Sequence, residues 1–70
     1  MNGYERLGNA VVMQAVRDWR SATRTLKRNP GNYEAKRLKE DCEQFFLSQY
    51  FNIYTDLDGR ALLDKLRKEG

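Results

Sequence analysis

The tetrapeptide Asn29-Pro30-Gly31-Asn32 separates two long segments with helical periodicity, and it constrains the fold more than any other part of the chain. Pro30 disfavours helical backbone angles at Asn29, and Gly31 tolerates the positive φ that many tight turns need. Four connecting residues suit a tight turn between two antiparallel helices. We therefore expect an αα-hairpin at this point.

The segment before the turn is predicted to be a helix from about Asn9 to Arg28, with Asn9 as its N-cap. Apolar side chains recur along it every three or four residues, as they do on a helix with one buried edge. We expect this edge to lie in the core, and it consists of Val12, Val16, Trp19, Thr23 and Leu26.

The segment after the turn is predicted to be a second helix from about Tyr33 to Ser48 or beyond, capped by Asn32. Its charges lie four residues apart and can pair along the helix, so the helix neutralises itself. The expected pairs are Lys36 with Glu40, Arg37 with Asp41, and Lys39 with Glu43. One face is expected to pack inward and carries Ala35, Leu38, Cys42, Phe45, Phe46 and Gln49.

The segment from Tyr50 to Tyr54 has a strand-like composition but no partner strand elsewhere in the chain. Two alternatives remain: it continues the second helix, or it forms a short separate helix capped by Ser48. A last helix is predicted from about Asp58 to Lys68, and its apolar residues are Ala61, Leu62, Leu63 and Leu66.

These elements predict an all-α fold: a small three-helix bundle, made of a long αα-hairpin and a C-terminal helix, with a short extra helix near residues 49–54 as the alternative. Seventy residues allow one domain, spanning 1–70. The sequence shows neither an apolar run approaching about 18 residues nor a signal-peptide pattern, so we expect no membrane association and a cytoplasmic location.

Few residues here could support catalysis or metal binding. The chain has no histidine, the usual general base and commonest metal ligand, and its one cysteine, Cys42, lies on the apolar face of the second helix. Residues 56–59 resemble the start of a calcium loop, but Arg60 and Arg67 occupy positions that need oxygen ligands. We expect Asp56 and Asp58 to act in helix capping, Cys42 to be a core residue, and the chain to have no catalytic residue, metal or cofactor.

The first helix carries basic side chains within an arc of about 100°, beside its apolar edge. This cationic edge consists of Arg6, Arg17, Arg20, Arg24, Lys27 and Arg28. The net charge of +3 and the pI near 9.2 permit nucleic-acid contact without requiring it. Three interpretations stay open: a solvated face, phosphate binding by counterion release, and recognition of carboxylates on a protein partner.

A second candidate surface is the aromatic segment, Tyr50, Phe51, Ile53 and Tyr54. We expect all four side chains to close the core. Any of Tyr50, Phe51 and Tyr54 left exposed would instead mark an interface with another protein or with a second copy of the chain.

The sequence resembles very short proteins of bacteriophages and prophages of low-GC Gram-positive bacteria. The resemblance extends from about Ala10 to Glu69. It rests on residues 11–20, on Asn29-Pro30 with Asn32 and Glu34-Ala35, on residues 45–48, and on residues 55–59 leading to 66–69. It assigns no role to any residue, but it implies a small early-region phage product. Such products commonly bind a host or phage macromolecule, and some inhibit defence nucleases.

The sequence therefore predicts a non-catalytic phage-derived binding protein that acts by protein–protein association. Inhibition of a bacterial defence system such as a CRISPR nuclease is one specific form of this hypothesis. The alternative is a sequence-nonspecific DNA- or RNA-binding accessory protein that uses the cationic edge.

Overall fold

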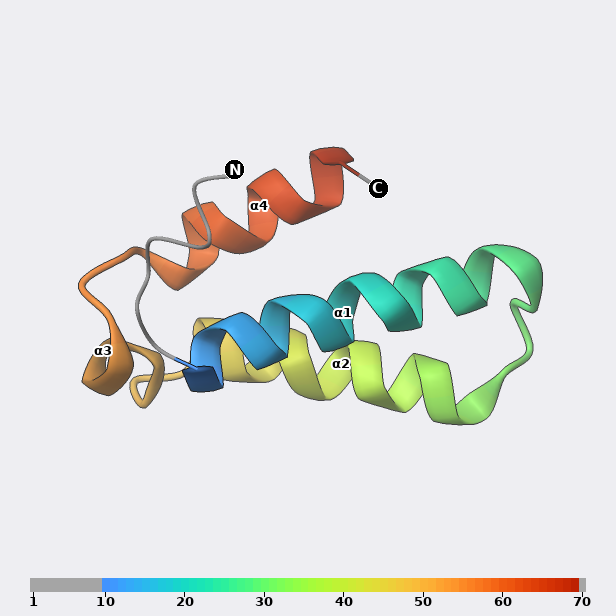
Figure 1. Cartoon of the computed structure of the whole chain (residues 1–70), viewed down its shortest axis with the longest axis horizontal. Helices are drawn as coiled ribbons and strands as arrows, with labels where there is room; N and C mark the ends of the chain where they lie inside the picture. Colours follow the sequence, from blue (N-terminus) through green and yellow to red (C-terminus); the bar gives the residue numbers. More distant parts are fainter. Residues whose placement is uncertain (1–9, 70) are drawn as a thin grey trace.

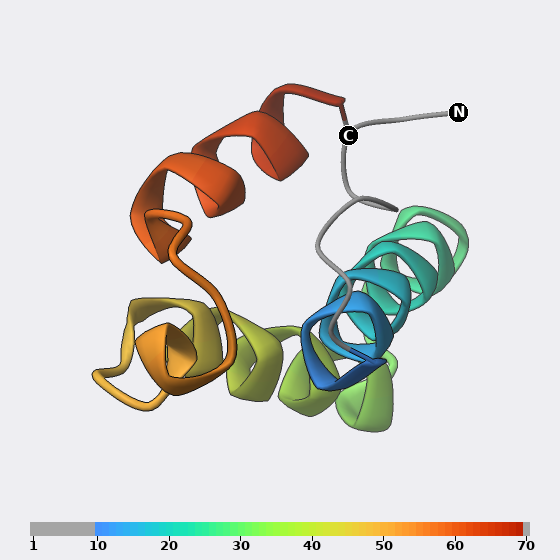
Figure 2. The same ribbon diagram turned by 60° about the vertical axis from the view of Figure 1, so that its left-hand side comes forward.

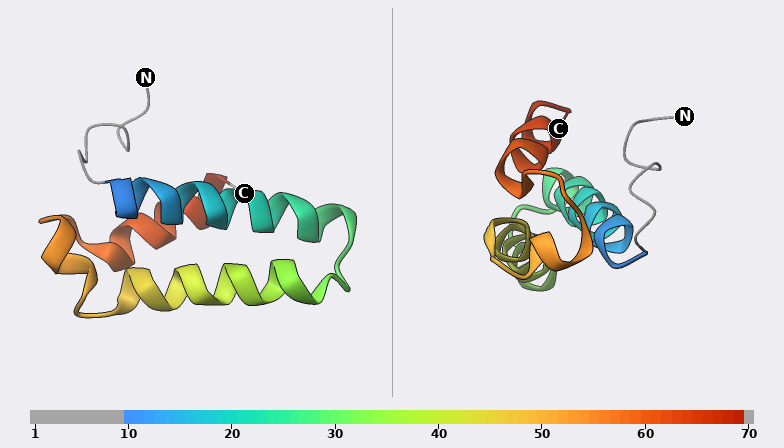
Figure 3. Two further views of the ribbon diagram at one scale, coloured as in Figure 1. Left: turned by 60° about the horizontal axis from the view of Figure 1, so that its bottom comes forward. Right: turned by 90° about the vertical axis from the view of Figure 1, so that its left-hand side faces the viewer.

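The computed structural model describes residues 10–69, and this range contains four helices and no strand (Figure 1). Helices α1 (Ala10–Arg28) and α2 (Tyr33–Leu47) run antiparallel and make the most extensive packing. Helix α3 (Phe51–Tyr54) is a single turn, and α4 (Gly59–Glu69) packs against one side of the hairpin (Figures 2 and 3). The predicted all-α bundle is confirmed, including the short extra helix.

The turn between α1 and α2 has the predicted form. The N–H of Asn29 donates to the carbonyl of Thr25 at 2.8 Å, and the N–H of Asn32 donates to the carbonyl of Asn29 at 3.0 Å. The side-chain oxygen of Asn32 accepts a hydrogen bond from the N–H of Ala35 at 2.9 Å, which confirms it as the N-cap of α2. The corresponding prediction for α1, a cap at Asn9, lies outside the described residues.

Ser48 ends α2 and does not cap the helix that follows. Both its hydroxyl and its backbone N–H donate to the carbonyl of Phe45, at 3.0 Å and 3.1 Å. Helix α3 starts after Tyr50, whose side chain makes no capping hydrogen bond. The prediction of a separate helix was right, and the predicted cap was wrong because Ser48 is used by the preceding helix.

Helix α4 begins one residue later than predicted. The carboxylate of Asp58 accepts hydrogen bonds from the N–H groups of Arg60, at 2.9 Å, and Ala61, at 3.4 Å. These are the bonds of an N-cap, so for Asp58 the capping interpretation is confirmed.

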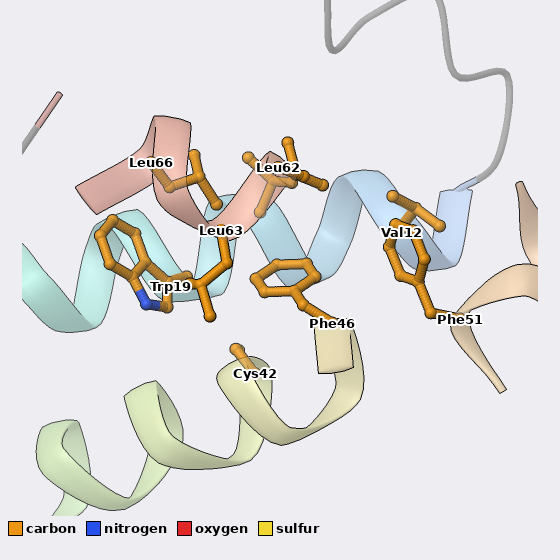
Figure 4. Packing of buried hydrophobic residues seen from close by; sticks show 9 residues of the cluster. Val12, Trp19, Cys42, Phe46, Phe51, Leu62, Leu63 and Leu66 are labelled. Atoms are coloured by element: carbon orange, nitrogen blue, oxygen red, sulfur yellow. The ribbon is translucent and has the colours of Figure 1, made fainter. Parts of the chain in front are cut away.

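The core draws side chains from all four helices (Figure 4). In α1, Thr23 and Leu26 are only partly buried, whereas Ala22 is buried, so the buried arc of α1 reaches beyond the predicted apolar edge. In α2, Leu38 is exposed, and so is Gln49 just beyond its end, contrary to the prediction. The core cluster consists of Val12, Val16, Trp19, Cys42, Phe46, Phe51, Leu62, Leu63 and Leu66.

Only one residue of the aromatic segment closes the core. Phe51 is fully buried, and its ring packs edge-on against those of Phe45 and Phe46, with centroids 5.6 Å and 6.0 Å apart. Tyr50, Ile53 and Tyr54 are exposed. A single helical turn cannot direct four bulky side chains to one side, so the expectation that all four point inward was wrong.

Candidate binding surfaces

The cationic edge of α1 faces solvent along most of its length. Arg17, Arg24, Lys27 and Arg28 are exposed, Arg20 is partly buried, and Arg6 lies outside the described residues. Lys27 and Arg28 occupy the last turn of α1, where the helix dipole favours positive charge. Their position is therefore partly explained by helix stability, whereas that of Arg17 and Arg24 is not.

A carboxylate from the far end of the chain lies against this edge. Arg20 forms an ion pair with Glu69 in the last turn of α4, with 2.7 Å between the guanidinium nitrogen and the carboxylate oxygen. The contact joins residues 49 positions apart, so no local pattern in the sequence could indicate it. It shows that one arginine of the cationic edge binds a carboxylate of the chain itself.

The ion pair stands in a groove between α1 and α4 with a volume of about 210 Å³. We call it the cationic groove. It brings together three of the predicted binding residues and leaves Arg17 and Arg28 outside. Its lining residues are Trp19, Arg20, Thr23, Arg24, Lys27, Leu66 and Glu69.

The hydroxyl of Thr23 is an unusual feature of this groove. Its Oγ1 is buried and has no hydrogen-bond partner in the part of the chain that the structure describes. A buried unpartnered hydroxyl costs about 1–3 kcal/mol. Thr23 was assigned to the apolar edge, and the structure places it at the boundary between the core and the groove.

Glu43 connects three helices beneath the same region. One carboxylate oxygen accepts the indole N–H of Trp19 at 3.0 Å, and the other accepts from Arg67 of α4 at 3.3 Å. Lys39 lies 3.9 Å away along α2, so the predicted Lys39–Glu43 pair is present. Glu43 of α2 thereby connects Trp19 of α1 with Arg67 of α4, and this linkage helps to position the cationic groove.

A second groove, which the sequence did not reveal, runs between α1 and α2 and has a volume of about 600 Å³. We call it the apolar groove. Val11 was outside the predicted apolar edge and Leu38 was assigned to the core, so neither marked a surface. The lining residues are Ala10, Val11, Gln14, Ala15, Asp18, Leu38, Asp41, Cys42 and Phe45.

Cys42 forms part of the buried floor of this groove, as expected of a small core residue. Burial raises the pKa of its thiol from 9.0 to about 11, and the negative charges of Asp18, Asp41 and Glu43 add to the shift. The thiol is therefore neutral near pH 7, where a nucleophile would need to be a thiolate.

The aromatic segment provides a smaller exposed patch. Tyr50 is 60% exposed and Ile53 is 72% exposed, while the buried Phe51 is unavailable to any partner. Tyr54 is exposed too, and its ring centroid lies 6.0 Å from that of Phe45. Of the three predicted interface residues, Tyr50 and Tyr54 thus lie on the surface, and Phe51 does not.

No cluster of three or more His, Cys, Asp or Glu side chains suited to a metal ion occurs within residues 10–69. Among the helices described, none has the length and apolar character needed to cross a membrane. Comparison of the chain with protein-family models, with curated proteins and with solved structures found no match.

Proposed function

We propose that this chain is a non-catalytic binding protein that associates with an acidic surface of another protein through its cationic groove. The observation that carries the proposal is the Arg20–Glu69 ion pair at 2.7 Å. A guanidinium presents its donors in a planar fork that matches a carboxylate. The groove therefore already contains one carboxylate, beside two further cations, Arg24 and Lys27.

The same ion pair makes a polyanion the less suitable ligand. Nucleic-acid binding by counterion release needs several cations that contact successive phosphates. Glu69 offsets the charge of Arg20 near the middle of the cationic edge. A protein carboxylate needs only the local pair Arg24 and Lys27, and Glu69 can remain in place.

The identity of the partner follows from the resemblance alone. We propose a host or phage protein in the cytoplasm of a bacterial cell, and a component of a defence system such as a CRISPR nuclease is the specific case. Inhibition would then result from occupying a surface of the partner, with no chemical step.

A second candidate function is nonspecific binding of DNA or RNA. The observation that favours it is that Arg17, Arg24, Lys27 and Arg28 are exposed and form no ion pair within the described residues. Under this alternative, Trp19, the only tryptophan and a lining residue of the groove, should report duplex binding by its fluorescence.

A charge-reversal pair tests the proposal. The double variant Arg24→Glu with Lys27→Glu alters the cationic groove. The matched control, Lys36→Glu with Arg37→Glu, makes the same charge change on exposed positions of α2. Each protein is used to capture partners from a bacterial lysate, with and without nuclease treatment, after circular dichroism has verified helical folding.

We expect the wild type to capture a partner even after nuclease treatment. The α2 control should still capture this partner, and the cationic-groove variant should not. The nucleic-acid alternative would be established if nuclease abolished capture and if binding to a DNA duplex weakened steeply with salt. Capture unaffected by the groove variant would show that the cationic edge is only solvated.

A further inference from the structure

The apolar groove lies at the seam of the hairpin and is lined by residues of α1 and α2. Helix α4 packs elsewhere on the hairpin (Figure 3). Its walls include two large aliphatic side chains in contact with solvent, Val11 at 47% exposure and Leu38 at 38%. Its floor includes Ala15, Cys42 and the partly buried Phe45. Exposed apolar side chains around a concave floor are typical of a protein-binding groove.

The charged residues of this groove are all acidic. Asp18 of α1 and Asp41 of α2 line it, and no lysine or arginine among residues 10–69 does so. Gln14 donates to the carboxylate of Asp18 at 2.8 Å and holds it along the α1 wall. Arg37, the predicted partner of Asp41, makes no ion pair with it in the described part of the chain.

Both carboxylates lie close to the Cys42 thiol at the groove floor. After burial, the Coulombic effects of Asp18 and Asp41 are the next largest causes of its raised pKa. The lining of the groove is therefore acidic, in a chain whose net charge is +3. The charge of this lining is opposite in sign to that of the cationic groove.

We propose that the apolar groove binds an amphipathic helical segment of a protein partner, whose apolar residues enter between α1 and α2 and whose flanking lysines or arginines contact Asp18 and Asp41. A helix laid into an apolar groove is an established mode of peptide recognition. The inference is independent of the proposed function, because the surface is different and selects the opposite charge.

The cationic edge of a second copy of the chain does not supply such a segment. The apolar side chains beside its own cationic edge, Val12, Val16 and Trp19, are buried in the core. The exposed side chains of α3 have no neighbouring cation within Phe51–Tyr54. We take the occupant to be a different protein, and self-association of the chain is an outcome that the test below distinguishes.

Two synthetic peptides of equal length provide the test. One has leucine on one helical face and lysine on the other, and the second has glutamate in place of every lysine. Binding is followed by the backbone amide shifts of the isotope-labelled chain. Because the net charge of +3 attracts the glutamate peptide nonspecifically, a preference for the lysine peptide reports the local acidic groove.

We expect the lysine peptide to bind more tightly and to shift the amides of Val11, Ala15 and Leu38. The double variant Asp18→Asn with Asp41→Asn should weaken this binding about tenfold, because two partly exposed ion pairs are lost. Leu38→Ser should abolish it. The control Ile53→Ser, which alters a side chain outside the groove, should have no effect.

The inference would be overturned if both peptides bound equally well, or if the amide shifts were confined to the cationic edge. It would also be overturned if the aspartate double variant bound the lysine peptide as tightly as the wild type. A concentration-dependent dimer that the Leu38→Ser variant fails to form would overturn it as well. The cationic-groove variant, Arg24→Glu with Lys27→Glu, should bind the lysine peptide at least as tightly as the wild type. This result separates the inference from the proposed function.

Discussion

Gly59 lies directly against the main chain of Phe46. A Cβ placed on Gly59 would lie 1.8 Å from the carbonyl oxygen of Phe46 and 2.9 Å from its carbonyl carbon. Both atoms belong to the backbone, so no side-chain rotation can relieve the clash. The first residue of α4 is therefore in close contact with the last turn of α2, and this contact sets where α4 begins its path across the hairpin.

Gly59→Ala should destabilise the protein by about 1–3 kcal/mol, since one helix must move to admit the methyl group. That is a large share of the stability of so small a domain. Urea denaturation followed by circular dichroism measures the change. The matched control is Gly31→Ala, whose Cβ would meet only the side chain of Asn29 at 3.8 Å. It should leave the midpoint unchanged or raise it slightly, and equal loss in both variants would contradict the packing argument.

Glu43→Ala should cost roughly 1–3 kcal/mol, because it leaves the indole N–H of Trp19 without an acceptor in a part-buried site. Glu40→Ala, on the exposed side of the same helix, is the control and should have little effect. A double-mutant cycle with Trp19→Phe, which removes the N–H, isolates this hydrogen bond. A coupling energy near zero would mean that Glu43 contributes through Arg67 and Lys39 alone.

Stability should fall as the pH rises above 9, because the Cys42 thiol has an ordinary pKa of 9.0 and a pKa of about 11 in the folded protein. Between these two pH values the unfolded chain has released the proton and the folded chain has kept it. Unfolding is therefore favoured progressively with pH, up to roughly 2–3 kcal/mol.

The variant Cys42→Ala is the control for this pH dependence, because it lacks the thiol and keeps every other ionisable group of the chain. The measured quantity is the difference in unfolding free energy between the wild type and Cys42→Ala, followed from below the ordinary thiol pKa of 9.0 up to about 11. A difference that does not change with pH would show that burial of the thiol has no energetic consequence.

The sequence determined the features that depend on neighbours a few residues away. Periodic apolar residues defined the three long helices to within one residue at the ends that can be compared. Asn32 and Asp58 cap their helices through hydrogen bonds to N–H groups two or three residues ahead, so a local pattern was enough to predict both. The turn at Pro30 and Gly31 was predicted for the same reason.

Only the tertiary structure decided which side chains meet across the bundle. The packing of α4 against the hairpin brings Glu69 to Arg20, and the arrangement of the helices buries Ala22 while leaving Leu38 in contact with solvent. Helical periodicity gives the direction of a side chain around its own helix, but not how many neighbouring helices cover that direction. The cationic groove, the apolar groove and the requirement for glycine at position 59 all arise from the placement of separate helices, so none of them has a local signature in the sequence.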